Sequence, residues 1–173
     1  ACLAHDIGNP PFGHSGEDAI ETALKRHGLE LPFEGNAQGF RILTRTGDPM
    51  EGSGLKLTAV VLGSFMKYPC TQSYSAAVKK GSIVAANKLE CKKFGIGEQE
   101  REAASFMAGH LGLIPRSTPD AAHLCWSRHP LAYLMEAADD ICYRIADIED
   151  GYFSGLLDFA PTRDLFSPFL TES

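Results

Sequence analysis

No stretch of this sequence is apolar over enough residues to cross a bilayer, and no charged leader with an apolar core marks a secretory signal. We therefore expect a cytoplasmic protein without a membrane partner. An excess of basic residues is also missing, since the 173 residues carry a net charge of −6 at pH 7. A chain of this sign has no general attraction for nucleic acid, so a polyanionic ligand has to be held by a metal ion and locally placed lysines.

The sequence also lacks the cysteine pairs that mark a disulfide framework or a redox motif. Its five cysteines are an odd number, and none lies in a Cys-x-x-Cys pair, so we expect reduced thiols. Most of them are expected to be small core residues. They are Cys2, Cys70, Cys91, Cys125 and Cys142.

Two further absences concern a loop and the start of the chain. Residues 46–54 are rich in Gly, Asp, Pro and Ser, which favours a surface loop, but they lack the Gly-Lys-Ser/Thr ending of a phosphate-binding P-loop. No capped, polar segment precedes the first helical pattern, so we expect the sequence to be a piece of a longer protein. Its length fits one domain, and its 44% hydrophobic and 22% charged residues are typical of globular proteins.

The residues with evident chemistry begin at the start of the chain. His5 and Asp6 are adjacent, and on a helix their side chains lie about 100° apart, so both could contact one cation. The pair predicts half of a metal site, with an N-cap beside a surface imidazole as the ordinary alternative. His14 follows a Gly- and Pro-rich turn. Glu17, three residues later on the first turn of a helix, is placed to fix the tautomer of that imidazole.

A second set of such residues lies on the longest helical pattern, residues 131–150. Asp139 borders its apolar stripe, whereas Asp140 falls on the polar side. Because a buried carboxylate without a positive partner is costly, we predict that Asp139 rather than Asp140 binds a metal ion. Tyr143 and Asp147 follow at intervals of four residues and form one ridge, which suits a nucleoside or is an ordinary helix surface. The predicted buried stripe is Leu131, Leu134, Met135, Ala138, Cys142, Ile145 and Ala146.

Periodicity and caps predict further helices elsewhere in the chain. The first should end at Gly28, and in the second Phe40 and Leu43 should point inward. Residues 70–91 show no strong period and predict no element. The expected helices cover residues 14–26, 34–43, 55–66 and 98–111, with a short one after residue 151.

Two long motifs resemble a known family. Residues 5–17, His-Asp-Ile-Gly-Asn-Pro-Pro-Phe-Gly-His-Ser-Gly-Glu, resemble the signature of HD-domain phosphohydrolases, and among them the deoxyguanosine triphosphate triphosphohydrolases, or dGTPases. Residues 136–150, Glu-Ala-Ala-Asp-Asp-Ile-Cys-Tyr-Arg-Ile-Ala-Asp-Ile-Glu-Asp, closely resemble the motif that supplies the family's last metal ligand, followed by a Tyr and an Asp. Weaker similar blocks lie at residues 34–43, 65–69 and 92–100, so the resemblance spans most of the chain.

The resemblance implies a fold and a set of roles. The fold is all-α, an HD-domain helical bundle, with residues 1–173 forming a partial HD domain that lacks the N-terminal helix and its first histidine ligand. Read without the resemblance, Asn36 is a cap or loop amide, Lys67 a charge at a helix end and Lys93 part of a solvated face. The resemblance assigns a divalent Mg²⁺ or Mn²⁺ ion to His5, Asp6 and Asp139, catalysis to His14 and Glu17, phosphate binding to Asn36, Lys67, Tyr68 and Lys93, and sugar binding to Tyr143 and Asp147.

The implied activity is metal-dependent hydrolysis of a deoxynucleoside triphosphate, with dGTP preferred, to the deoxynucleoside and inorganic triphosphate. The resemblance also implies a homo-oligomer for the full-length protein and an effector that is single-stranded DNA or a nucleotide. Because one ligand is expected upstream, the segment by itself should bind the metal poorly and turn over little. The alternatives are another HD-domain phosphohydrolase, such as a deoxynucleotidase or phosphodiesterase, and a non-catalytic nucleotide-binding or assembly module with an incomplete metal site.

Overall fold

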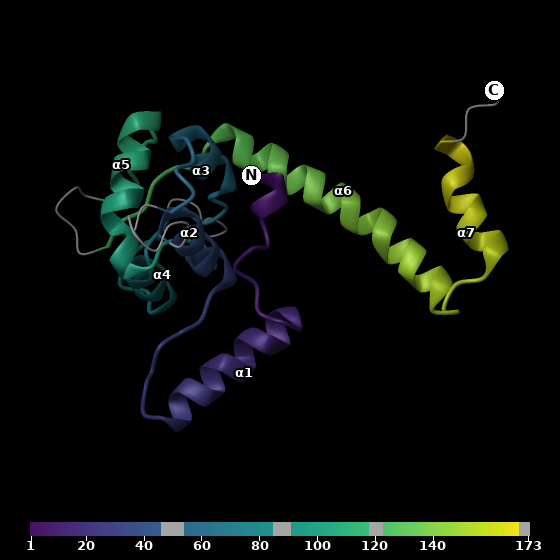
Figure 1. Cartoon of the computed structure of the whole chain (residues 1–173), viewed down its shortest axis with the longest axis horizontal. Helices are drawn as coiled ribbons and strands as arrows, with labels where there is room; N and C mark the ends of the chain where they lie inside the picture. The colour runs from purple at the N-terminus through teal and green to yellow at the C-terminus, as the bar shows by residue number, and fades with distance from the viewer. Residues whose placement is uncertain (46–53, 85–90, 118–122, 170–173) are drawn as a thin grey trace. The chain divides into compact units, whose positions relative to one another are not determined.

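The computed structural model describes residues 1–45, 54–84, 91–117 and 123–169. Within these ranges the chain is helical, and its only β-type pairings are isolated bridges, so the predicted all-α class is confirmed (Figure 1). The chain forms two compact units, Ala1–Met135 and Glu136–Ser173. The loop predicted at residues 46–54 lies outside the described residues except for Gly54. None of the helices in the described ranges has the length and apolar character that a membrane crossing needs.

Among the described residues, the first unit holds five α-helices and the first turns of a sixth. Most begin or end where the predicted signals lie. Gly28 ends the first helix with φ of 76°, and Gly112 ends the fifth with φ of 61°, as a left-handed residue does at a helix C-terminus. The helices are α1 (Gly13–Arg26), α2 (Gly35–Arg45), α3 (Ala59–Phe65), α4 (Gln72–Lys79), α5 (Arg101–Leu111) and α6 (Pro130–Phe153).

Two helices differ from the prediction because side-chain caps decide where they start. Helix α3 begins four residues later than predicted, since the Thr58 side chain accepts a hydrogen bond from the Val61 amide and caps its first turn. Helix α4 was not predicted. Thr71 caps it in the same way by accepting a hydrogen bond from the Tyr74 amide. The helix is stabilised by the burial of Tyr74, although its sequence has no strong helical period.

Helices α2, α3 and α5 pack around the main hydrophobic core of the first unit (Figure 1). Phe40 and Leu43 of α2 are fully buried there, as predicted. Burying a large apolar side chain contributes about 1.5–3 kcal/mol, so this core dominates the stability of the unit. Its other largest members are Phe65, Met66, Ile96, Met107 and Trp126.

Three segments without regular structure lie side by side beneath α4. The Thr71 amide donates to the Leu124 carbonyl at 2.9 Å, and the Trp126 amide donates to the Pro69 carbonyl at 2.9 Å. On the other side, the Gly95 amide donates to the Cys70 carbonyl at 3.2 Å. These bonds hold residues 69–71 between residues 124–126 and residues 94–96.

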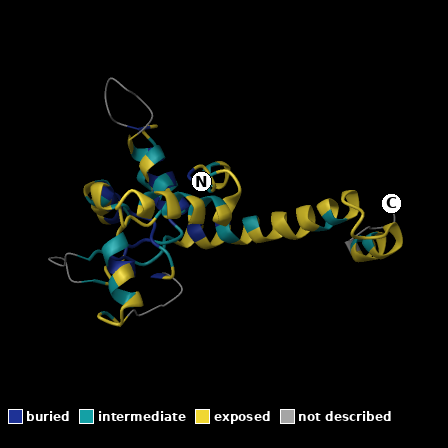
Figure 2. Ribbon diagram, turned by 90° about the horizontal axis from the view of Figure 1, so that it is seen from below, coloured by how far each residue is buried: buried dark blue, intermediate teal, exposed yellow. Residues whose placement is uncertain are grey.

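The second unit contains the rest of α6 and helix α7 (Phe159–Phe166), which is the short helix predicted after residue 151. The prediction of a buried stripe along α6 is wrong for this structure, because only Met135 of its seven members is buried. Figure 2 shows most of this long helix in the colour of exposed residues. A helical period marks a face suited to burial, whereas burial itself needs a second element over that face. The six exposed members are Leu131, Leu134, Ala138, Cys142, Ile145 and Ala146.

Candidate active site

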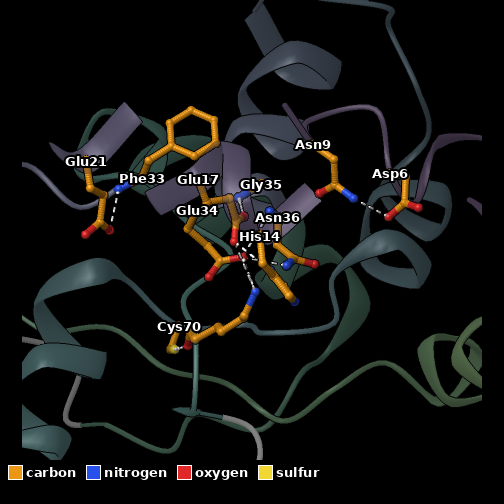
Figure 3. A network of polar contacts seen from close by, with 11 residues as sticks. Asp6, Asn9, His14, Glu17, Glu21, Phe33, Glu34, Gly35, Asn36 and Cys70 are labelled. Atoms are coloured by element: carbon orange, nitrogen blue, oxygen red, sulfur yellow. Dashed lines mark hydrogen bonds and ion pairs between the residues drawn. The ribbon is translucent and has the colours of Figure 1, made fainter. Parts of the chain in front are cut away.

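His5 and Asp6 lie in a turn rather than on the helix predicted for them. The chain starts with a short 3₁₀ helix, Cys2–Ala4, and the pair follows it directly. The contact between their side chains does not depend on an α-helix, because His5 Nε2 lies 3.3 Å from Asp6 Oδ2. Asn9 donates through Nδ2 to the other Asp6 oxygen at 2.8 Å and so fixes the carboxylate (Figure 3).

The hydrogen bonds of this turn indicate which atoms could meet a cation. His5 Nδ1 lies 2.7 Å from the Cys2 carbonyl, which can only accept, so the proton of the neutral ring is on Nδ1 and the lone pair is on Nε2. Metal-binding histidines use the same arrangement, with the second nitrogen donating to a carbonyl or carboxylate. The chemistry of the two donor atoms therefore fits the predicted half-site. No third His, Cys, Asp or Glu joins them in a metal-binding group among the described residues.

Glycines bring this turn directly onto α2. A Cβ atom on Gly8 would overlap the carbonyl oxygen of Gly35 and the amide nitrogen of Gly39. The backbone of the turn therefore packs against the backbone of the first turn of α2, an approach that only glycine permits. This contact holds the turn that carries His5 and Asp6 against α2.

His14 and Glu17 form the contact that their spacing predicts. His14 Nδ1 lies 2.9 Å from Glu17 Oε2, with the imidazole 83% exposed and the carboxylate 13% exposed. The other oxygen, Glu17 Oε1, accepts a hydrogen bond of 2.9 Å from the Gly35 amide. Glu17 thus ties α1 to the first residue of α2 while it holds the histidine.

Lys93 joins this pair from a distant part of the sequence. Its Nζ lies 3.6 Å from Glu17 Oε2 and 3.5 Å from Glu34 Oε1 (Figure 3). Glu34 is buried, and its Oε1 also accepts from Asn36 Nδ2 at 2.7 Å. The predicted catalytic pair and two of the four predicted phosphate-binding residues therefore belong to one network.

The network keeps Glu17 in its charged form. Burial by itself raises the pKa of this carboxyl. The hydrogen bonds from His14 and the Gly35 amide outweigh that effect, and the charges of Lys93 and His14 add to them. The net pKa of Glu17 lies below its ordinary value of 4.5, so the group is a carboxylate at neutral pH.

The other two predicted phosphate-binding residues, Lys67 and Tyr68, follow α3 and are half-buried. The Tyr68 ring lies against the guanidinium of Arg128, whose central carbon is 5.6 Å from the ring centroid. The backbone of Tyr68 runs next to Gly95, where a Cβ atom would overlap the Tyr68 carbonyl. The segment therefore lies beside the one that carries Lys93, although its side chains are not part of the network in Figure 3.

No protein-family model matches the chain. Curated relatives do match it, under the name deoxyguanosinetriphosphate triphosphohydrolase-like protein. One from Synechocystis sp. is 46% identical over 180 residues, which cover 95% of this chain and 39% of the relative. One from Pseudomonas aeruginosa is 42% identical over 179 residues, covering 95% of this chain and 37% of the relative. One from Streptomyces coelicolor is 35% identical over 162 residues, covering 91% and 32%.

The chain belongs to the deoxyguanosinetriphosphate triphosphohydrolase-like family. The family predicted from residues 5–17 and 136–150 is thereby confirmed. The chain spans at most about two fifths of the length of these relatives.

The remaining residues that the family resemblance assigns lie on α6, in the second unit. Asp139 is half-buried, and Asp140 is exposed. Tyr143 and Asp147 are both exposed and follow on the same helix at four-residue intervals, so they share one ridge. The helix is confirmed, whereas the metal-binding role of Asp139 and the sugar-binding roles of the other two stay predictions.

Two residues of the site in this triphosphohydrolase-like chain were not predicted. Glu34 comes directly before Gly35 and Asn36, and an acidic residue just ahead of a helix start is a signal that could have found it. Arg128 lies between two tyrosine rings, 5.6 Å from the centroid of Tyr68 and 5.4 Å from that of Tyr133. No sequence pattern reveals the contact with Tyr68, because it joins residues 60 positions apart.

Proposed function

We propose that this chain carries the catalytic residues of a metal-dependent hydrolase that converts a deoxynucleoside triphosphate, with dGTP preferred, to the deoxynucleoside and inorganic triphosphate. The observation that supports it is the network of His14, Glu17 and Lys93 in a member of the triphosphohydrolase-like family. Its parts are an exposed imidazole, a carboxylate that orients it, and a cation beside that carboxylate. Phosphate-ester hydrolysis needs groups of these kinds.

His14 is the residue that would handle the proton of the leaving group. Glu17 accepts at Nδ1, so a second proton on the ring sits on Nε2 and is stabilised by the nearby carboxylate. The imidazole is largely exposed and can reach a bound substrate. In this role His14 donates a proton to the departing 5′ oxygen as a general acid.

Lys93 and its neighbours would hold the phosphates. The ammonium group of Lys93 is partly exposed beside Glu17 and Glu34, so it can contact an incoming phosphate oxygen without leaving its place. Lys67 and Tyr68 would add contacts from the adjacent segment, and Asn36 would add an amide donor.

His5, Asp6 and Asp139 are the residues that would hold a Mg²⁺ or Mn²⁺ ion. Such an ion, when bound, polarises a phosphate oxygen at the α-phosphorus and lowers the pKa of an attacking water molecule. Tyr143 would pack on the sugar, and Asp147 would accept a hydrogen bond from a sugar hydroxyl. On family likeness, the proposal includes a homo-oligomer and an effector that is single-stranded DNA or a nucleotide, and on the sequence pattern it includes a cytoplasmic location.

The test uses the full-length protein with dGTP and either Mn²⁺ or Mg²⁺, with EDTA as the metal-free control. We expect deoxyguanosine and triphosphate in equal amounts and none with EDTA. His14→Gln should lower kcat by about 10²–10⁴-fold, the usual contribution of a general acid. His27→Gln is the matched control, because His27 is an exposed histidine at the other end of α1, and it should keep full activity.

A substrate panel separates this proposal from other phosphohydrolases. The panel contains dGTP, dATP, a nucleoside monophosphate and a cyclic nucleotide. Preference for the monophosphate or the cyclic nucleotide would contradict the proposal, and so would nucleotide binding without any metal-dependent product.

A further inference from the structure

Three thiols meet in a second buried cluster, which also contains Tyr74 of α4 and which shares Cys70 with the network of Figure 3. Cys70, Cys91 and Cys125 are 0%, 3% and 1% exposed. The sulfur atoms of Cys91 and Cys125 lie 3.9 Å apart. Cys70 and Cys125 face each other across an isolated antiparallel bridge, in the pairing that brings side chains closest.

The three sulfurs do not act alike. Contacts with the sulfurs of Cys125 and Cys70 lower the pKa of Cys91, although burial opposes the shift. Contacts with the other two sulfurs and burial raise the pKa of Cys70, so that group keeps its proton. Burial and the neighbouring thiols also raise the pKa of Tyr74, to about 12, so its phenol stays neutral beside them. Of the three sulfurs, Cys91 is therefore the one whose surroundings favour the thiolate, the form of cysteine that oxidants attack.

Among the described residues, these sulfurs belong to no group of three ligands that could hold a metal ion. A pair of sulfurs 3.9 Å apart needs to approach by about 2 Å to reach the S–S bond length of about 2.05 Å.

The cluster is connected to the candidate active site through Lys93. The Cys70 thiol donates to the Lys93 carbonyl at 3.4 Å (Figure 3), and Cys91 lies two residues before Lys93 in the chain. Ser75 Oγ donates a hydrogen bond of 3.1 Å to the Cys91 carbonyl and so holds the backbone of Cys91 in place. Movement of Cys91 towards Cys125 therefore strains the backbone that sets the place of the Lys93 ammonium.

We propose that Cys91 and Cys125 form an oxidation site for peroxides, and that closing their disulfide draws Lys93 away from Glu17 and Glu34. The Cys91 thiolate attacks hydrogen peroxide, breaks its O–O bond and becomes a sulfenic acid as hydroxide leaves. The Cys125 thiol then displaces that sulfenic oxygen, and the S–S bond forms as water leaves. Overall, two thiols lose two electrons and two protons, and one peroxide becomes two water molecules. The effect on catalysis rests on the proposed function, whereas the disulfide itself does not.

Peptide mapping tests the site without any substrate. The full-length protein is treated with hydrogen peroxide, remaining thiols are alkylated, and the protein is digested with trypsin. We expect residues 89–92 linked to residues 117–128, with the link lost after dithiothreitol. A link between residues 68–79 and 117–128, which would be Cys70 with Cys125, overturns the proposal. So does the absence of any link at a dose that oxidises the exposed Cys2 and Cys142.

Kinetics and binding test the connection to Lys93. Oxidation should raise the KM for dGTP about tenfold, the effect of losing one charge-assisted contact, and dithiothreitol should reverse it. Cys125→Ala should abolish the response, and Cys142→Ala, at an exposed cysteine, should keep it. A disulfide with an unchanged KM would overturn the connection. If the reduced protein does not hydrolyse dGTP, the proposed function fails. The effect on Lys93 is then measured by calorimetry, as a loss of affinity for inorganic triphosphate on oxidation. The peptide map still tests the disulfide by itself.

Discussion

Glu17 connects more parts of the candidate active site than any other side chain. One oxygen holds His14, and the other accepts from the Gly35 amide at the start of α2. The carboxylate also lies 3.6 Å from the Lys93 ammonium. A single side chain thus positions the proposed acid, joins two helices and attracts the proposed phosphate-binding cation, so both activity and stability should depend on it.

The pH dependence of stability should reveal this role of Glu17. Its pKa in the folded protein lies below 4.5, so the ionised group stabilises the fold above about pH 4.5, and that contribution is lost as the pH falls through the lowered pKa. The urea concentration at half-unfolding should fall as the pH is lowered below 4.5, and Glu17→Gln should make that fall less steep. Asp18→Asn, at the exposed next position of α1, is the control and should follow the unchanged protein. An acid-side slope that is the same in all three proteins would contradict the network.

Lys93 and its neighbour Lys92 offer a matched pair for the phosphate-binding role. Lys93 lies beside two carboxylates, whereas Lys92 is exposed. Lys93→Met should raise the KM for dGTP about tenfold, because one charged contact to a phosphate is lost. Lys92→Met should leave KM unchanged. Steady-state kinetics on the full-length protein measures both, and equal effects at the two positions would point to general attraction instead of a site.

Backbone contact between the first turn of the chain and α2 brings residues 5–17 and residues 34–43 together. The contact depends on Gly8, Gly35 and Gly39, and no side chain can replace a hydrogen atom at Gly8 without a clash. Residues that are 27 or more positions apart in sequence meet there, which places Glu17 within reach of the Gly35 amide.

Alanine at two glycines should have opposite effects on stability. Gly8→Ala should destabilise the protein by about 1–3 kcal/mol or more, because the new methyl group overlaps the backbone of α2. Gly109→Ala should stabilise it by about 0.5–1 kcal/mol, since Gly109 lies within α5 with open space where a Cβ would go. Urea denaturation of both variants tests the contact. A neutral Gly8→Ala would contradict the close packing of the turn on α2.

The sequence predicted the elements that local patterns determine. Helices α1, α2 and α5 follow from periodicity and glycine stops, and α6 from its long pattern with a proline in the first turn. Helix α4 escaped prediction because burial of Tyr74 and the Thr71 cap stabilise it, and neither is a periodic signal. His5 and Asp6 were expected on a helix but lie in a turn. Gly8 and the two prolines that follow it do not favour a continuing helix.

The site was predictable only where its residues are close in sequence. The contact of His14 with Glu17 follows from a spacing of three residues, and it is observed. The ion pairs of Lys93 with Glu17 and Glu34 join residues at least 59 positions apart, so only the fold reveals them. The family resemblance placed Lys93 and Asn36 among the phosphate-binding residues but said nothing of Glu34, which contacts both.

The chain covers only part of the length of its relatives. It spans 37–39% of the Synechocystis and Pseudomonas relatives. Large apolar side chains along α6 and α7 are exposed, among them Ile141, Phe153 and Phe159. Activity, substrate preference and assembly are therefore questions for the full-length protein, and the experiments above use it.

Hydrolysis of dGTP in ¹⁸O-labelled water tests the central claim most directly, because it identifies both the products and the bond that is broken. The proposal places His14 at the departing 5′ oxygen and the attack at the α-phosphorus. Mass spectrometry should therefore find one ¹⁸O atom in inorganic triphosphate and none in deoxyguanosine. Label in deoxyguanosine, or products that are dGMP and pyrophosphate, would contradict the proposed function.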